Sequence, residues 1–501
     1  MPSLSRIFRK VIEICAYALS GVLICLVVAA VWYLESRPDL EIWHTADLDM
    51  EFTVERRDDP AGPVNTFEAY QALEQQLFDQ LDQLVIRASE SAPQSRINRF
   101  HRNSLASPGR WPQNWNRSFE LPADSAKAGV LLLHGMSDSP YSLRALAQQV
   151  NQLGAWALAL RVPGHGTAPS GLAKTTWQDM SAAVQIAAEH LRNKIGNAPL
   201  YIVGYSNGGA LALEYALRAL DDHNLPKASG LVLISPQVGL TPLAAFAVLQ
   251  EKLGHLLVLE KLAWNAILLE YDPFKYGSFA LNAAIQAWEL TSRNQKTIQH
   301  KASTGGLAEL PPILAFQSTV DATISAPALV DSLFSHLGSS QPHEMVLFDI
   351  NRETEVENIL SKDPGGWFNP LLEQQSLEFA VSLVANEDED TRAVVVRYKA
   401  AGQSNMVPCK LDMQWPDDVY SLSHVALAIA EDDPLYGSGE ALSPGLKLGD
   451  LILRGERDTL RISASEILRQ RWNPFYDYLS ARAHTFMGLL TPSDGICDPG
   501  K

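Results

Sequence analysis

A single serine stands between two glycines in the stretch YIVGYSNGGAL, residues 201–211. Its centre, GYSNG at 204–208, fits the pattern G-x-S-x-G, in which a serine on a sharp strand-to-helix turn acts as a nucleophile. Side chains two positions before and after that serine would collide, so glycine is expected at both. Five residues are a weak signal alone, but the strand-like run LYIV precedes them and the helix-like run ALALEYALRAL follows. We therefore interpret Ser206 as a nucleophile.

The loop after another strand-like run offers a second component of this chemistry. It begins within LLLHGMSDSP, residues 131–140. Attack of a serine on a carbonyl creates an oxyanion, which needs two preorganised N–H donors. We expect these to be the backbone amides of Asn207, directly after the nucleophile, and of Met136 in this loop. His134 stands before a glycine at the start of the loop, and we assign it a structural role.

The surrounding sequence alternates between strand-like and helix-like segments. This alternation predicts a mostly parallel central sheet with helices on both faces, and sites in such sheets lie at the carboxyl ends of the strands. The expected strands are 118–121, 129–133, 156–161, 200–203, 230–234, 313–317 and 345–350, with helices at 141–153, 176–195 and 208–220.

At this point a family resemblance becomes specific. The stretch HGMSDSPYSLRALAQQVNQLGAWALALRVPGHGTAPSGL, followed by TTWQDM, resembles the α/β-hydrolase superfamily. It is most similar to bacterial carboxylesterases and monoacylglycerol lipases, in the group that also includes serine aminopeptidases, and RVPGHGTAP at 161–169 is a characteristic loop of that group. The resemblance covers about residues 115–350 and the region near 424. It implies the α/β-hydrolase fold but says little about the substrate.

The resemblance also implies a chain order of serine, acid and histidine. Asp321 follows the apolar run ILAF and is the expected acid, which would orient the imidazole and stabilise its charged form. Asp349, in MVLFDINR, is the competing candidate, but it ends what looks like the next strand. His424 is the expected base, because it follows the strand-like run VYSLS and precedes an apolar run.

Three other histidines lie after the acid in the chain. His336 and His343 flank a helix end and a strand start, on the wrong side of the sheet, and His484 lies inside the expected last helix, residues 462–490. The separation between Asp321 and His424 is longer than in a minimal hydrolase. We attribute it to an insertion at about 353–415, which reads as acidic loops with one strand, AVVVRYKA.

The chain divides into four predicted parts. Residues 1–10 form a cytoplasmic N-terminus, 11–34 a transmembrane anchor, 35–115 an arm with an amphipathic helix at 66–87, and 116–501 the hydrolase domain. Within that domain, a helical cap at about 237–300 is unusually apolar. It either packs on the core or forms a lid that lines an acyl pocket and excludes water, and both roles are compatible.

The anchor is predicted from ICAYALSGVLICLVVAAVWYL, an uncharged run over residues 14–34 that is about long enough to cross a bilayer. Basic residues precede it and mostly acidic ones follow it, so the positive-inside rule leaves the N-terminus in the cytoplasm. We expect a single-pass protein of the cytoplasmic membrane with its catalytic domain on the exported side. The alternative is a cleavable signal peptide, with VAA at 28–30 as a weak cleavage site.

Composition limits the classes of partner. The 501 residues carry a formal net charge of -17, which argues against nucleic acid. No HExxH motif, no Cys/His pair at ligand spacing and no glycine-rich phosphate loop is present, so we expect neither a metal nor a cofactor. Of the four cysteines, Cys409 and Cys497 lie in the predicted exported part and form a disulfide or remain free thiols.

These features predict a membrane-anchored serine hydrolase that cleaves carboxylic esters of lipid-like acids. The apolar cap and the tether favour an apolar acyl ester over a peptide. Two rivals remain open: a serine peptidase or amidase that uses the same triad, and a non-catalytic binding protein that keeps the fold. A serine at 206, where dehalogenases and epoxide hydrolases of this fold use aspartate, argues against those two reactions.

Overall fold

The apolar runs between the helices form one ten-stranded sheet in the computed structural model, in the order β1-β3-β2-β4-β5-β8-β9-β10-β11-β12. The strands from β3 to β10 in this order pair in parallel, which suits continuous apolar runs because helices bury both faces of such a sheet. These strands are β2 (Gly129–Leu133), β3 (Trp156–Leu160), β4 (Leu200–Tyr205), β5 (Gly230–Ile234), β8 (Ile313–Ser318), β9 (Glu344–Phe348) and β10 (Ala380–Asn386).

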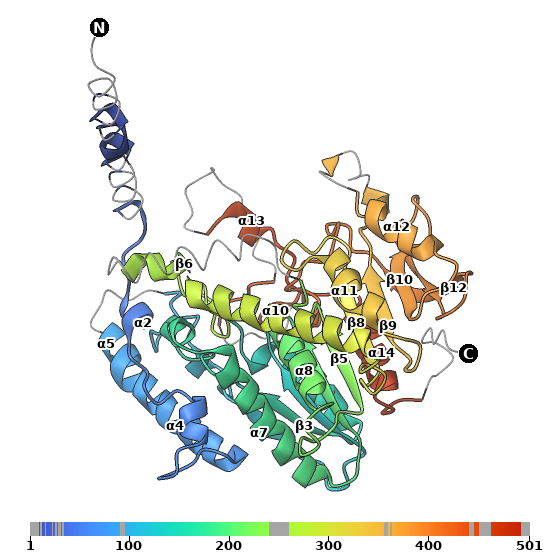
Figure 1. Ribbon diagram of the computed structural model, residues 1–501, viewed down its shortest axis with the longest axis horizontal. Helices are drawn as coiled ribbons and strands as arrows, with labels where there is room; N and C mark the ends of the chain where they lie inside the picture. Colours follow the sequence, from blue (N-terminus) through green and yellow to red (C-terminus); the bar gives the residue numbers. More distant parts are fainter. Residues whose placement is uncertain are drawn as a thin grey trace.

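Alternate side chains of each strand belong to two separate hydrophobic cores. Leu131 and Leu133 of β2 lie in one core, whereas Val130 and Leu132 lie in the other, as the two-residue period of a strand requires. The first core contains α7 (Trp177–Ile195), α8 (Asn207–Arg218), α10 (Leu281–Ser303) and α11 (Ala326–Ser332). The second contains α6 (Arg144–Gln152) and α14 (Tyr476–Phe486). Figure 1 shows α7, α8 and α10 running across one face of the sheet.

Three antiparallel strands complete the sheet. They are β1 (Phe119–Leu121), β11 (Ala393–Lys399) and β12 (Val407–Gln414). The segment 353–415, expected as loops with one strand, therefore holds three strands of the main sheet and α12 (Gly365–Glu373), and the expectation of a loop insertion is wrong. Side chains of the edge strand β12 alternate between exposed and half-buried, so its sequence lacks an apolar run.

Two expected elements at the end of the chain are also different. VYSLS, before His424, is not a strand: β12 already forms the far edge of the sheet, and the segment instead follows a looped path. The single long helix predicted over 462–490 is two helices, α13 (Ala464–Ile467) and α14. Pro474 lies between them, and a proline interrupts a helix because it lacks the amide donor.

The N-terminal arm packs onto the sheet as a structural part of the domain, at the blue end of Figure 1. It contains α2 (Ile42–Thr45), α3 (Val54–Arg57), α4 (Phe67–Leu81), which continues through a π-helical turn (Asp82–Ile86), and α5 (Arg87–Ser89). The fully buried Arg161 guanidinium pairs at 2.9 Å with both Glu51 and Glu74 of this arm. Tyr70 donates its hydroxyl to the Arg161 carbonyl at 2.6 Å.

The structure describes residues 35–90, 96–239, 260–354, 359–360, 363–439, 445–449 and 462–491, with isolated positions between 10 and 32. Much of the predicted anchor, residues 240–259 of the predicted cap, and Cys497 lie outside this set. Within it, no helix combines the length and apolar character needed to cross a bilayer, so the transmembrane-helix prediction is not supported. Cys409 is disulfide-bonded. The described cap contains α10 and a small sheet of β6 (Trp264–Ala266) and β7 (Phe279–Ala280).

Candidate active site

Ser206 lies on the turn between β4 and α8, with φ of 54° and ψ of -116°. This left-handed backbone is strained for a serine and is typical of a nucleophile held at a tight turn. A Cβ added to Gly204 would lie 2.4 Å from the Gly208 carbonyl oxygen, and one added to Gly208 would lie 2.0 Å from that of Leu133. Both glycines of the motif are therefore required by close backbone contact.

The structure brings His424 to this serine from a loop far along the chain. The His424 Nε2 atom lies 3.0 Å from the Ser206 Oγ atom, and its Nδ1 atom lies 2.8 Å from the Asp321 Oδ2 atom. Since a carboxylate can only accept, Nδ1 carries the proton and Nε2 is free to accept one from Ser206. The imidazole is 4% exposed and lies at the carboxyl ends of the strands.

Asp321 follows β8 and accepts from several groups besides the histidine. Gln317 Nε2 donates to its Oδ2 atom at 2.8 Å, and the amides of Thr323 and Ile324 donate to Oδ1 at 2.8 and 2.9 Å. Burial alone would raise the pKa of Asp321. The charge and hydrogen bond of His424 and the two amides oppose burial, and the pKa lies below its usual range. The carboxylate is thus held ionised and oriented toward the imidazole.

The two predicted oxyanion donors lie on either side of the serine. Asn207 is the first residue of α8, whose opening amides have no partner within the helix. Met136 lies in the loop after β2 and lines the same cavity as Ser206. Among the described residues, neither backbone amide donates a hydrogen bond to another group. Ser137, directly after Met136, has φ of 62°, so the loop turns sharply at this point.

The remaining histidines lie elsewhere. His134 uses both ring nitrogens structurally: Nδ1 contacts the Gly135 carbonyl at 2.9 Å and Nε2 accepts from the Val162 amide at 3.0 Å. Burial holds the pKa of His134 well below its usual value. His343 precedes β9 and accepts from the Ile313 amide at 3.2 Å, at the opposite end of the strands. His484 is buried in α14, and His336 ends a short 3-10 helix.

The other candidate acid, Asp349, does not meet a histidine. It follows β9 and pairs with Arg352, whose Nε atom lies 2.8 Å from the Asp349 Oδ2 atom. Burial raises the pKa of Asp349, although Arg352 partly opposes that effect. The structure therefore separates the two candidates, and only Asp321 contacts His424.

A cavity of about 540 Å³ opens over Ser206 and His424. The described part of the predicted cap contributes apolar side chains to it, among them Leu268, Leu269 and Phe279. Its walls also carry charged groups that the sequence analysis did not single out: Asp138, Asp272, Lys275, Glu466, Arg469 and Arg471. No sequence motif marks these residues, since they come from separate loops that only the fold brings together.

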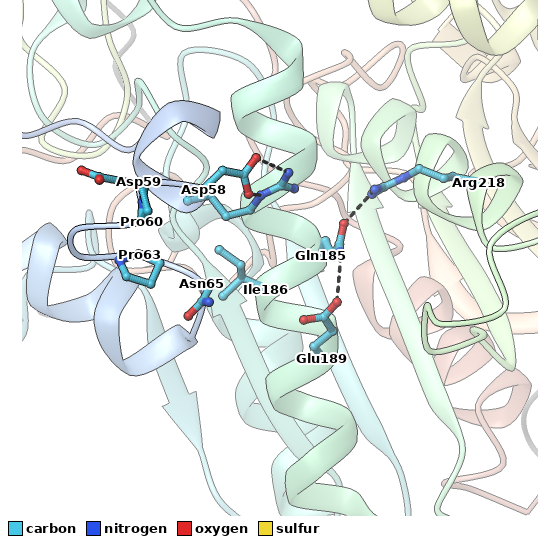
Figure 2. A pocket seen from close by; sticks show the side chains of 10 residues that line it. Asp58, Asp59, Pro60, Pro63, Asn65, Gln185, Ile186, Glu189 and Arg218 are labelled. Atoms are coloured by element: carbon cyan, nitrogen blue, oxygen red, sulfur yellow. Dashed lines mark hydrogen bonds and ion pairs between the residues drawn. The ribbon is translucent and has the colours of Figure 1, made fainter.

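A second cavity, of about 610 Å³, lies between the arm and α7 (Figure 2). Its polar groups are largely paired with one another. The Gln185 amide donates to Glu189 and accepts from Arg218, both at 2.8 Å, and Arg57 pairs with Asp58. None of the predicted site residues lines it, so its larger volume does not mark the candidate site. Over the described residues, no group of His, Cys, Asp and Glu side chains could hold a metal ion.

Comparison with known proteins agrees with this architecture. Residues 124–340 match the hydrolase family described as serine aminopeptidase S33, which is somewhat less than half of the chain. The matching stretch has an α/β-hydrolase fold. The match includes the Ser206 turn and Asp321 but ends before His424.

Similarity to individual curated proteins covers part of the chain. A thermostable monoacylglycerol lipase of a Bacillus species is 32% identical over 123 residues, which are 25% of this chain and 46% of that protein. This chain thus spans less than half the length of the curated relatives it matches.

Two solved structures are more distantly similar. A monoacylglycerol lipase of Paleococcus ferrophilus has 19% identity and a TM-score of 0.35, and covers 46% of this chain and 88% of its own. A soluble variant of a Saccharomyces cerevisiae monoglyceride lipase has 16% identity and a TM-score of 0.36, with 46% and 82% coverage.

Proposed function

We propose that this α/β-hydrolase is a serine hydrolase of the carboxylesterase or lipase type. The observation that carries the proposal is the continuous set of contacts from Asp321 through His424 to Ser206, at 2.8 and 3.0 Å, at the floor of a cavity. The similarity to monoacylglycerol lipase over 123 residues supports an ester as the substrate. The apolar side chains of the cap support an acyl group of apolar character.

The proposed reaction has two halves. The Ser206 oxygen attacks the ester carbonyl while His424 takes its proton, and the amides of Met136 and Asn207 stabilise the oxyanion. Collapse of this intermediate breaks the bond between the carbonyl carbon and the oxygen of the alcohol, and His424 protonates the departing alcohol. Water then attacks the acyl-serine and gives a proton to His424, which passes it to the Ser206 oxygen as the acid is released. Asp321 orients the imidazole and stabilises its charged form in both halves.

The test is hydrolysis of p-nitrophenyl esters of increasing acyl length by the full chain in detergent micelles. We expect Ser206→Ala to lower kcat by a factor on the order of 10⁶. The matched control is Ser235→Ala, because Ser235 also has a positive φ, directly follows the neighbouring strand and has no partner for its hydroxyl among the described residues. An active Ser206→Ala protein would contradict the proposal.

Labelling by a fluorophosphonate separates the rival functions. A folded protein whose Ser206 is not labelled would support a non-catalytic binding role. Labelling without hydrolysis of any ester would favour a peptidase or amidase on the same triad, which peptide and amide substrates would then test.

We further propose, from the sequence alone, that residues 11–34 tether the enzyme to the cytoplasmic membrane with the hydrolase domain on the exported side. The uncharged run and its flanking charges support this proposal. Fractionation of cells that express the full chain, with a topology reporter at the C-terminus, tests it. Recovery in the soluble fraction would contradict the tether.

A further inference from the structure

One wall of the Ser206 cavity carries a cationic side chain, that of Lys275, which forms no ion pair or hydrogen bond within the described part of the chain. The Tyr276 amide donates to the Ser137 carbonyl at 2.8 Å, which fixes this segment beside the predicted oxyanion loop. Burial lowers the pKa of Lys275, and the attraction of Asp138 and Asp272 opposes burial only in part, so the charge beside the candidate site is incompletely compensated.

Acidic groups in the same cavity are already occupied or only weakly ionised. Asp272 accepts from the Tyr436 hydroxyl at 2.8 Å and from the amides of Phe274 and Lys275 at 2.9 and 3.1 Å. Burial raises the pKa of Asp138 to about 7, so this carboxyl is only partly charged at neutral pH. Both acids attract Lys275, but neither forms an ion pair with its ammonium group at contact distance.

Two arginines from the loop after α13 add to the positive charge. Arg471 Nη2 donates to the Tyr271 hydroxyl at 3.3 Å and to the Glu466 carbonyl at 3.1 Å, and its buried Nε atom has no partner among the described residues. Arg469 Nη2 donates to the Thr323 hydroxyl at 2.9 Å, while its Nη1 atom is 3.8 Å from the Glu466 carboxylate. The cavity therefore has more donors for an anion than the protein itself uses.

We propose that the cavity selects esters that carry an anionic group, such as a carboxylate or a phosphate, which binds Lys275 with Arg469 and Arg471 nearby. This inference rests on the proposed function, since it names the substrate class of the same site. Apolar side chains of the cap would hold the hydrocarbon part of such an ester, and the cations would hold its charged end.

Matched ester pairs test the proposal. On the acyl side, p-nitrophenyl hexanoate is compared with the p-nitrophenyl monoester of adipic acid, which differs by a terminal carboxylate. On the alcohol side, a monoacylglycerol is compared with the same acylglycerol 3-phosphate. For at least one pair, we expect the wild-type kcat/KM to be about tenfold higher for the anionic ester.

Variants at Lys275 connect that preference to the residue. Lys275→Met should lower the anionic-to-neutral ratio of kcat/KM about tenfold, and Lys275→Arg should retain most of it. Lys174→Met is the control, because Lys174 is exposed and pairs with Asp47 away from the cavity. No anionic preference in either pair, or an unchanged ratio in Lys275→Met, would overturn the proposal.

A second measurement uses only the wild type, so it tests the proposal even if the Lys275→Met protein does not fold. Free adipate should slow fluorophosphonate labelling of Ser206 in the wild type, whereas neutral hexanamide at equal concentration should not. Equal effects of the two would overturn the proposal. If neutral esters are hydrolysed without an anionic preference, only this inference fails; if Ser206 is not labelled and no ester is cleaved, the proposed function fails and this inference fails with it.

Discussion

The loops that follow β8 and β9 begin side by side, but the aspartates they carry contact different partners. Ser318 and Phe348 are register partners at the carboxyl ends of these two parallel strands. Asp321 comes three residues after the first strand, and Asp349 comes one residue after the second. Asp321 meets His424, whereas Asp349 meets Arg352 within its own loop.

This difference shows how far topology determines a site. Parallel strands deliver several polar side chains to one edge of the sheet, but the partner that arrives from elsewhere decides what each can do. His424 lowers the pKa of Asp321 despite burial, and burial raises the pKa of Asp349 despite Arg352. Asp321 is therefore placed to stabilise a charged imidazole, whereas Asp349 forms an ion pair within its own loop.

The largest expected effect comes from neutralising each aspartate in turn. Asp321→Asn should lower kcat by about 10⁴, because an amide no longer fixes the imidazole tautomer or stabilises its charge. Asp349→Asn should change kcat by less than about tenfold, since it touches no member of the triad. Steady-state kinetics on one ester measures both. Similar losses in the two variants would remove the distinction between the loops.

A smaller effect is expected from the groups that support each aspartate. Gln317→Met removes a donor to the Asp321 carboxylate, so kcat should fall about tenfold while KM stays unchanged. Arg352→Gln removes the donor to Asp349 and should leave kcat unchanged. A change confined to KM in Gln317→Met would show that Gln317 does not act through Asp321.

The smallest expected effect is on the pH dependence of stability, and it has opposite signs at the two sites. Because its folded pKa is lowered, Asp321 contributes stability that is present above pH 4 and is lost as the pH falls further. The folded pKa of Asp349 is raised, so its contribution is present below pH 4 and is lost as the pH rises.

Urea unfolding of each Asn variant and the wild type between pH 3 and 6 measures this difference. We expect the free energy of unfolding to change with pH in opposite directions for the two variants. The free energy of unfolding of the wild type should exceed that of Asp321→Asn by less as the pH falls. It should exceed that of Asp349→Asn by less as the pH rises toward neutral. Parallel trends would contradict the opposite pKa directions.

The sequence predicted the residues of the candidate site more accurately than it predicted the helices, strands and loops on which those residues lie. The Ser206 turn was predictable because steric exclusion requires glycine at 204 and 208. His424 was named from a strand that does not exist, and it reaches Ser206 from a loop instead. The catalytic roles of these residues stay predictions until the variants are measured.

Other features were beyond the sequence for physical reasons. Strand β12 is an exposed edge, so it lacks the apolar signal that marks β4 or β5, whereas β10 carries an apolar run that was not recognised among the neighbouring acidic residues. Among the cations of the cavity, Lys275 is nearly 200 residues away from Arg469 and Arg471 in the sequence. The three share a site only after folding.

The buried pairing of Arg161 with the arm limits how far this chain can be shortened and still fold. The stretch that matches the family begins at residue 124, but Glu51 and Glu74, which neutralise Arg161, lie well before it. A chain trimmed to the matching stretch would bury a guanidinium without its counterions, at a cost of about 3–5 kcal/mol. Residues 124–340 are therefore not expected to fold alone, and a shortened or fused protein has to include the N-terminal arm.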